Sequence, residues 1–158
     1  MAIEIERKFL IKNGLWRDAV EHFCHYRQGY LIGAKKSSVR VRVAGDRAWL
    51  NIKGATLGVV RAEYEYEIPV GEANEMLENL CEKPLIEKVR YTVPHAGHVW
   101  EVDVFEGENE GLVVAEIELT DECETFEKPE WVADEVSDDP RYYNVCLIDH
   151  PYSKWKMS

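Results

Sequence analysis

The segment Ile3-Glu4-Ile5-Glu6-Arg7-Lys8-Phe9 begins with a strict alternation of apolar and charged side chains. Because successive side chains of a β-strand point to opposite faces, its two glutamates and its lysine share one face. The two isoleucines and the phenylalanine share the other face. This is the pattern of a strand with one apolar and one charged face, and it recurs along most of the chain.

Period-two alternation predicts eight strands, and the connections between them are short and rich in turn residues. The predicted strands are Ile3–Ile11, Tyr26–Ile32, Ser38–Val43, Ala48–Lys53, Arg61–Ile68, Glu87–Val93, Val99–Phe105 and Leu112–Leu119. The stretches predicted to be helical are Leu15–Phe23, Gly71–Glu82, Asp121–Ala133 and Tyr143–Ile148. Short connections favour hairpins, so the expected fold class is mainly β (α+β) with an antiparallel sheet.

The charged faces of these strands hold blocks of one sign. The basic blocks are Arg40 with Arg42 and Lys88 with Arg90, and the acidic blocks are Glu101 with Asp103 and Glu116 with Glu118. One interpretation is an open sheet whose charged face lies in water. The other is a closed barrel, which removes the exposed sheet edges and places the charged faces around an interior.

An interior lined by both signs of charge suits phosphoryl-transfer chemistry. Arginine and lysine donate charge-assisted hydrogen bonds to phosphate oxygens. Clustered carboxylates raise one another's pKa values or bind a cation, and hard oxygen ligands select Mg²⁺ or Mn²⁺. A basic half that holds a polyphosphate beside an acidic half that holds a divalent ion is what this chemistry needs.

Length and composition narrow the class of protein. The chain has 158 residues, enough for a sizeable core, and residues 1–158 are expected to form a single domain. Lys plus Arg number 19 and Asp plus Glu number 30, and the net charge of −11 argues against nucleic-acid or membrane partners. The sequence shows neither an apolar run of about 20 residues nor a signal-peptide pattern. The four cysteines form no zinc or redox motif, so the expected location is cytoplasmic.

The motif Glu4-x-Glu6-x-Lys8 resembles the signature of the CYTH superfamily, the triphosphate tunnel metalloenzymes. Further segments match in order: RQGYL (27–31), VRVR (39–42), LNIK (50–53), RAEYEYEI (61–68), IEKVRY (86–91), WEVDVF (100–105), AEIE (115–118) and RYYN (141–144). The resemblance is greatest to the short bacterial members that hydrolyse inorganic tripolyphosphate. It implies an eight-stranded antiparallel closed β-barrel, the triphosphate tunnel, with a few helices packed outside.

The resemblance also implies roles for individual residues. The expected ligands of Mg²⁺ or Mn²⁺ are Glu4, Glu6, Glu116 and Glu118. The expected triphosphate-binding residues are Lys8, Arg40, Arg42, Lys53, Lys88 and Arg90, with Arg61 as a weaker candidate because it begins its strand. Four further carboxylates either bind a second metal ion or balance charge: Glu63, Glu65, Glu101 and Asp103.

Two residues are candidates for the general base. Tyr30 shares a face with Gln28, and surrounding cations lower the pKa of a tyrosine; the alternative for Tyr30 is a packed strand aromatic. Lys8 has the same potential if its neighbours depress its pKa.

The predicted function is metal-dependent hydrolysis of a linear triphosphate, with inorganic tripolyphosphate as the expected small-molecule substrate. The alternatives are a class IV adenylyl cyclase, a thiamine triphosphatase, and a polyphosphate-binding module without turnover. A cyclase must also hold the base and the sugar, for which eight strands and their helices leave little chain. The sequence does not decide the oligomeric state.

One segment departs from the family pattern. Related short members often carry a lysine within the closing Tyr-x-Asn segment, where Tyr143 and Val145 stand here. A C-terminal segment that latches the tunnel mouth would then take its cation from elsewhere, with Lys154 and Lys156 as candidates.

Overall fold

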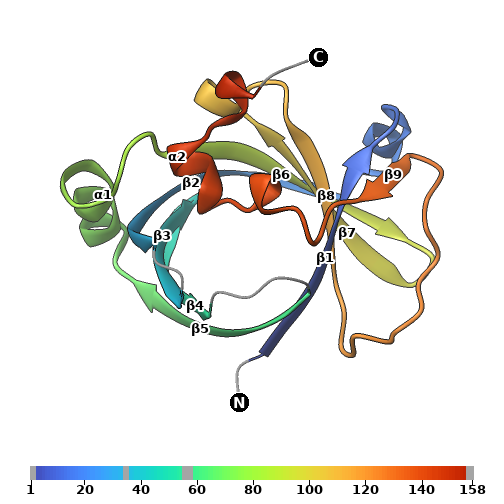
Figure 1. Cartoon of the computed structure of the whole chain (residues 1–158), viewed down its shortest axis with the longest axis horizontal. Coiled ribbons are helices and arrows are strands. Elements are labelled where there is room, and N and C mark those ends of the chain that lie inside the picture. The colour runs from blue at the N-terminus through green and yellow to red at the C-terminus, as the bar shows by residue number, and fades with distance from the viewer. Residues whose placement is uncertain (1–2, 34–35, 55–58, 156–158) are drawn as a thin grey trace.

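The computed structural model describes residues 3–33, 36–54 and 59–155 (Figure 1); Lys156 lies outside these ranges. The strands are β1 (Ile3–Ile11), β2 (His22–Gly33), β3 (Ser37–Ala44), β4 (Arg47–Gly54), β5 (Val60–Ile68), β6 (Ile86–His95), β7 (His98–Phe105), β8 (Val113–Glu118) and β9 (Val132–Glu135). The α-helices of the described ranges are α1 (Val70–Asn79) and α2 (Cys146–Asp149). Four short 3-10 helices complete the fold: η1 (Leu15–Ala19), η2 (Gly107–Asn109), η3 (Pro140–Tyr142) and η4 (Tyr152–Lys154).

All strands belong to one antiparallel sheet that closes on itself. Its order is β5-β4-β3-β2-β6-β7-β8-β1-β9, and a further pairing of β5 with β1 joins the ends of the first eight strands. The closing seam is short, with Glu4 opposite Arg61 at its centre. The prediction of an eight-stranded closed barrel is therefore confirmed, and the open-sheet interpretation is wrong. Strand β9 is an addition that pairs with the far end of β1.

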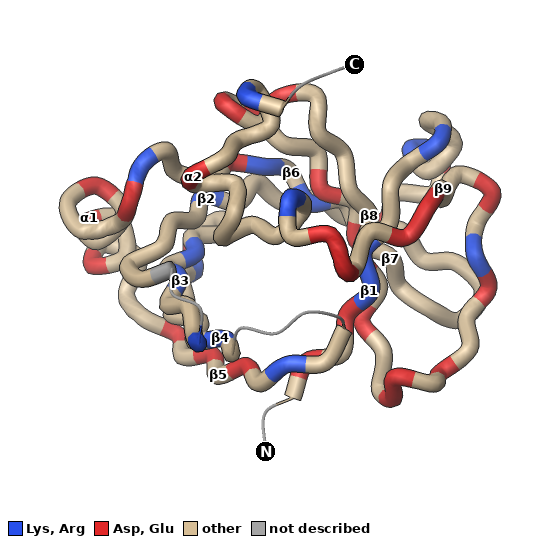
Figure 2. The backbone as a smooth tube through the Cα atoms, in the orientation of Figure 1, with Lys and Arg blue, Asp and Glu red and all other residues tan. Residues whose placement is uncertain are grey.

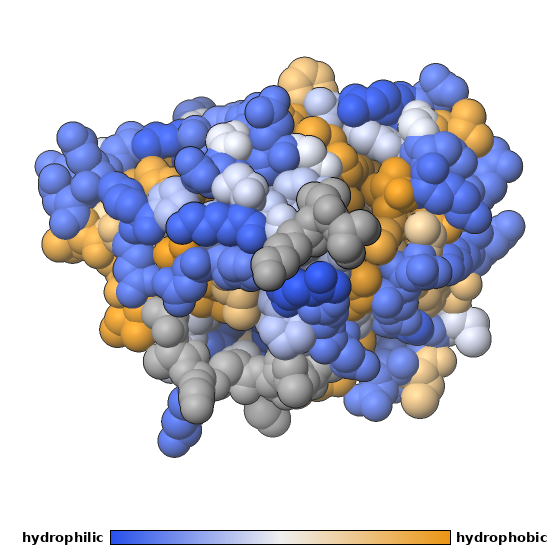
Figure 3. Space-filling model, turned by 45° about the horizontal axis from the view of Figure 1, so that its top comes forward, coloured by the Kyte–Doolittle hydropathy of each residue, from blue (hydrophilic) through white to orange (hydrophobic). Residues whose placement is uncertain are grey.

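The apolar faces of the strands pack outward against covering segments. Helix α1 places Ala73 and Leu77 on Val41 and Ala48 of the barrel wall. Burial of such side chains stabilises the fold by about 1.5–3 kcal/mol each. The face of the molecule shown in Figure 3 is mostly hydrophilic, with apolar patches between the hydrophilic residues. Lysine, arginine and carboxylate positions follow the strands that surround the opening of the barrel (Figure 2).

The C-terminal segment crosses one end of the barrel (Figure 1). Val136 N donates to Lys8 O at 2.8 Å, and Lys8 N donates to Ser137 Oγ at 2.9 Å. Beyond this point Lys8 Nζ donates to the carbonyl oxygen of Tyr142 at 3.1 Å. These contacts fix the segment that carries η3 and α2 over the tunnel.

Gly29 permits a close approach between the barrel and the chain that follows α1. A Cβ atom at this position would lie 2.7 Å from Leu85 Cδ2 and 2.9 Å from Cys81 Cβ. Next to it, Glu82 N donates to Tyr30 O at 2.9 Å. The absence of a side chain at Gly29 thus lets residues 81–85 pack directly on β2.

Two predicted helices are wrong. Of the predicted helix Leu15–Phe23, only Leu15–Ala19 is helical, as η1, because β2 already begins at His22 and pairs with β6 from there. The predicted helix Asp121–Ala133 is absent, and this stretch is a loop that leads into β9. Local side-chain hydrogen bonds replace the helical ones: Glu124 Oε1 accepts from Thr120 N at 2.7 Å, and Glu124 Oε2 lies 2.6 Å from His98 Nε2.

The other two predicted helices exist with different bounds. Gly71–Glu82 corresponds to α1, and Tyr143–Ile148 corresponds to the single turn of α2. Within the described ranges, no helix has the length and apolarity needed to cross a bilayer.

Candidate active site

The interior of the barrel is a cavity of about 400 Å³ lined mostly by charged side chains. Seven cations reach it: Lys8, Arg40, Arg42, Lys53, Arg61, Lys88 and Arg90. Seven carboxylates reach it as well: Glu4, Glu6, Glu63, Glu65, Glu101, Glu116 and Glu118. The structure therefore brings together every predicted triphosphate-binding residue and all four predicted first-choice metal ligands.

Five of these cations form ion pairs with carboxylates. Lys53 Nζ lies 3.1 Å from Glu4 Oε2 and 3.2 Å from Glu63 Oε2. The other pairs include Lys8 with Glu116 at 3.7 Å, Arg61 with Glu4 at 3.7 Å, Lys88 with Asp103 at 2.7 Å and Arg90 with Asp103 at 2.8 Å. Burial, helped by the charges of Arg40 and Arg61, lowers the pKa of Lys53.

Arg40 and Arg42 are held by neutral groups instead. Arg40 Nε and Nη2 donate to Asn51 Oδ1 at 3.4 and 3.3 Å, and Arg42 Nε donates to Gln28 Oε1 at 3.3 Å. Within the described residues neither arginine has a carboxylate in ion-pair contact. Burial, together with the nearby charges of Arg40 and Arg90, lowers the pKa of Arg42 to about 10. These two guanidinium groups are the positive charges most available to an anion.

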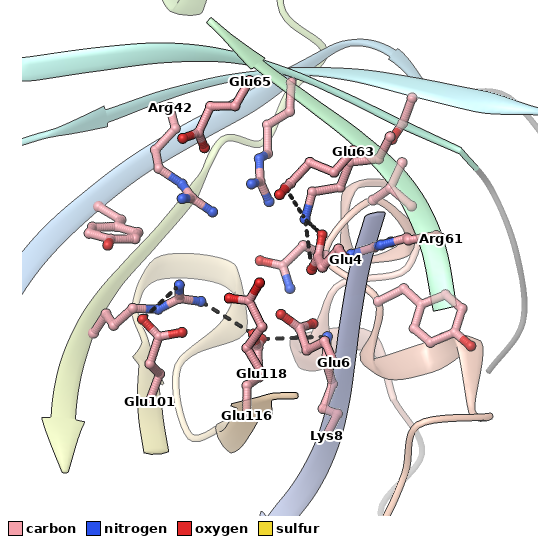
Figure 4. Close-up of a pocket in the computed structure, with 18 of the residues that line it drawn as sticks. Glu4, Glu6, Lys8, Arg42, Arg61, Glu63, Glu65, Glu101, Glu116 and Glu118 are labelled. Atoms are coloured by element: carbon pink, nitrogen blue, oxygen red, sulfur yellow. Dashed lines mark hydrogen bonds and ion pairs between the residues drawn. The ribbon is translucent and has the colours of Figure 1, made fainter. Parts of the chain in front are cut away.

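The acidic side of the cavity contains carboxylates that face one another. Glu6 and Glu118 stand directly opposite across β1 and β8, and their carboxylates point toward each other in the cavity (Figure 4). Burial, together with the charges of Glu4 and Glu6, raises the pKa of Glu118. Like charges directly opposite on neighbouring strands are destabilising unless a cation lies between them.

The donor set of this side fits a divalent cation of the Mg²⁺ or Mn²⁺ type. It consists of carboxylate oxygens, which are the ligands such ions prefer. Glu4 Oε2 is buried and accepts no hydrogen bond, although it lies in ion-pair range of Lys53. In the arrangement described, no group of three or more such side chains already has metal-binding geometry. Glu4 and Glu116 would have to turn away from their cationic partners to join Glu6 and Glu118.

Asp103 stands apart from the other predicted ligands. Its side chain is fully buried, accepts from Lys88 Nζ at 2.7 Å and makes two bonds with Arg90, at 2.8 and 2.9 Å. It is not among the residues that line the cavity. This position favours charge balance over metal binding for Asp103, while Glu63, Glu65 and Glu101 do reach the cavity.

Both general-base candidates line the cavity. Tyr30 is 4% exposed and also packs against the apolar cluster beneath the C-terminal segment. Its environment therefore has features of both interpretations, a proton acceptor in the tunnel and a packed strand aromatic. Lys8 Nζ lies between Glu116 and the carbonyl oxygen of Tyr142. Lys154 lies in η4 and is not among the residues that line the cavity, whereas Lys8 and Lys88 of the barrel wall contact Tyr142 and Asn144 of the C-terminal segment.

Sequence reasoning missed three polar residues of the site. Tyr26 lines the cavity, and its ring contacts Arg42 and Arg90. Asn144 Oδ1 accepts from Gln28 Nε2 at 2.8 Å and from Lys88 Nζ at 3.0 Å. The signal for Tyr26 and Gln28 was available, because both share the strand face of Tyr30. No sequence pattern places Asn144 beside β6.

Comparison with protein families gives a match to the CYTH domain over residues 2–143. The chain belongs to the CYTH family. The CYTH chain is 54% identical to an inorganic triphosphatase of Acetivibrio thermocellus over 156 residues, which cover 99% of each protein. It is 37% identical to an inorganic triphosphatase of Nitrosomonas europaea over 149 residues, covering 91% of this chain and 95% of the relative.

Solved structures agree with the fold. The crystal structure of the inorganic triphosphatase NE1496 superposes with a TM-score of 0.67 at 34% identity and covers 92% of this chain and 97% of its own. A Hippeastrum protein described as a putative adenylyl cyclase with a dominant triphosphatase activity superposes with a TM-score of 0.57 at 17% identity. At that distance the likeness concerns the fold alone.

Proposed function

We propose that this CYTH protein hydrolyses inorganic triphosphate inside the barrel, with a divalent metal ion. The observation that carries the proposal is the charge arrangement of the barrel cavity. Among the described residues, Arg40 and Arg42 have no carboxylate in ion-pair contact, and the same cavity holds Glu6 and Glu118, which have no cationic partner. The names of the two relatives supply the reaction and its substrate class.

The basic wall provides the binding energy for the substrate. Arg40 and Arg42 would donate to phosphoryl oxygens at once, because no carboxylate has to be displaced from them. Charge-assisted hydrogen bonds of this kind contribute about 1.5–3 kcal/mol each. Lys53, Lys88 and Arg90 would complete the contacts and hold the chain of phosphates in one orientation.

The acidic wall is the place for the metal ion. Glu4, Glu6, Glu116 and Glu118 would hold it, and when bound the ion supplies positive charge next to the phosphoryl group that is transferred. These carboxylates come from the neighbouring strands β1 and β8 and lie on one wall of the cavity.

Hydrolysis requires an attacking water whose proton goes to a nearby group. The water oxygen forms a bond to the terminal phosphorus while the bond to the bridging oxygen breaks, which releases phosphate and pyrophosphate. The Tyr30 hydroxyl oxygen and Lys8 Nζ are the two candidate proton acceptors on the cavity wall. Tyr30→Phe and Lys8→Met each remove one of these proton acceptors. The variant with the larger loss of kcat identifies the group that accepts the proton.

One assay tests the proposal. The protein is incubated with tripolyphosphate, ATP or thiamine triphosphate, each with Mg²⁺, Mn²⁺ or EDTA, and phosphate and cyclic AMP are measured. We expect the highest kcat/KM with tripolyphosphate and no turnover in EDTA. A higher kcat/KM for cyclic AMP formation would make the protein a cyclase. Binding of tripolyphosphate without turnover under any condition would make it a binding module.

A further inference from the structure

Tyr26, near the start of β2, lies between two arginines of the cavity wall. The guanidinium carbon of Arg42 is 4.9 Å from the centroid of the Tyr26 ring, and that of Arg90 is 5.1 Å from it. Both distances fall within the range of about 6 Å over which the face of an aromatic ring attracts a cation. One neutral ring therefore contacts two of the cations that line the cavity.

The two arginines depend on this ring to different degrees. Arg90 is fixed by Asp103, which accepts from Nε at 2.8 Å and from Nη2 at 2.9 Å, and it also pairs with Glu101 at 3.4 Å. Arg42 has a single side-chain hydrogen bond in the described structure, a long one of 3.3 Å to Gln28 Oε1. The Tyr26 ring therefore provides a much larger share of the contacts that orient Arg42 than of those that orient Arg90.

Arg42 also stands where positive charge accumulates. Its neighbours include Arg40 and Arg90, whose positive charges repel its own. A carboxylate placed there would hold Arg42 but would also cancel its charge before any substrate arrived. An aromatic face attracts the guanidinium through the ring quadrupole and leaves the positive charge available.

We propose that Tyr26 is a positioning residue, whose ring holds Arg42 beside Arg90 in the orientation that receives phosphoryl groups. The inference rests on the proposed function, since it concerns the binding of the same triphosphate. A side chain held in place before binding loses less conformational freedom when the ligand arrives, so the ring contributes to affinity without touching the substrate.

Substitutions that remove or keep the ring face test this role. Tyr26→Leu should raise the KM for tripolyphosphate by about 3- to 30-fold, the range that one desolvated cation–π contact supports, with a smaller change in kcat. Tyr26→Phe keeps the ring and should restore KM towards the wild-type value. The matched control is Tyr66→Leu on β5, which removes a tyrosine that is 56% exposed on the outside of the molecule. Thermal melting shows whether each variant is folded, and Tyr26→Met replaces Tyr26→Leu if the latter does not fold.

A double-mutant cycle with Arg42 decides whether Tyr26 acts through that residue. In an Arg42→Ala background, Tyr26→Leu should have little further effect on KM. An unchanged KM in Tyr26→Leu, or an equal effect in both backgrounds, would overturn the proposal. The dissociation constant of tripolyphosphate, measured by calorimetry in EDTA, gives the same comparison without turnover. The Tyr26 inference therefore remains testable even if the wild-type protein hydrolyses nothing and the proposed function fails.

Discussion

Replacement of Glu118 by glutamine is expected to raise stability and abolish activity. Glu118 stands directly opposite Glu6, and burial with the nearby carboxylates raises its pKa. Two unit charges 4 Å apart repel by about 4 kcal/mol at an effective dielectric constant of about 20. Because Glu118 is largely exposed to solvent in the cavity, screening reduces this to about 1 kcal/mol. For a domain of this size, 1 kcal/mol corresponds to about 2–4 °C in melting temperature.

The pH dependence of the stability gain tests the same charge repulsion independently. A carboxyl whose folded-state pKa is raised costs stability only where it is ionised, above its ordinary pKa of 4.5. The gain from Glu118→Gln should therefore be present at pH 7 and disappear as the pH falls below about 4.

Melting curves in EDTA and in Mg²⁺ or Mn²⁺ measure this prediction. In EDTA, Glu118→Gln should melt above the wild type, whereas added metal should stabilise the wild type and leave the variant nearly unchanged. Glu110→Gln, in an exposed turn away from the cavity, is the matched control. A variant that melts below the wild type in EDTA, or that gains as much from the metal, would refute the placement of these carboxylates in a metal site.

Three further predictions follow from the described contacts. Arg42→Ala should lower kcat/KM for tripolyphosphate by roughly 10–1000-fold in a folded protein, and near-native kinetics would place this arginine outside the binding site. Hydrogen bonds led by the one from Thr120 N lower the pKa of Glu124 to about 2, so this residue stabilises the fold above pH 4.5 and loses that effect as the pH falls toward 2. Urea midpoints of Glu124→Gln should accordingly lie below those of the wild type at pH 7 and approach them near pH 2, and parallel curves would contradict this. Gly29→Ala should destabilise the protein by about 1–3 kcal/mol because its Cβ would meet Leu85, and an unchanged denaturant midpoint would show that this packing yields freely.

The strands were predictable because their period-two pattern is long and regular. Charge on one face and apolar side chains on the other locate every barrel strand to within a few residues of its observed bounds. Closure was not predictable from alternation alone, because a solvated sheet and a charged tunnel share the same pattern. The resemblance to the family decided between them.

The errors have local physical causes. Leu15, Ala19 and Phe23 are spaced like one face of a helix, but β6 offers β2 a ladder of backbone partners from His22 onward, and this tertiary contact outweighs the local pattern. The contact between the Tyr26 ring and Arg42 depends on where side chains of the neighbouring strands β2 and β3 meet. No spacing within one strand reports such a contact.

The position of β1 between strands from later parts of the chain also determines when the barrel can close during translation. Strand β1 leaves the ribosome before all of its partners, and β8 and β9 emerge long after it. Strands β2 to β5 form a meander of neighbours in sequence, whereas the pairing of β1 with β8 joins residues of very high sequence separation and is slow to form. A nascent chain that has not yet produced β8 therefore carries Glu6 and Lys8 without the strand that pairs with them. The acidic wall of the cavity is complete only once β8 has joined β1, so no folding intermediate without β8 possesses the site.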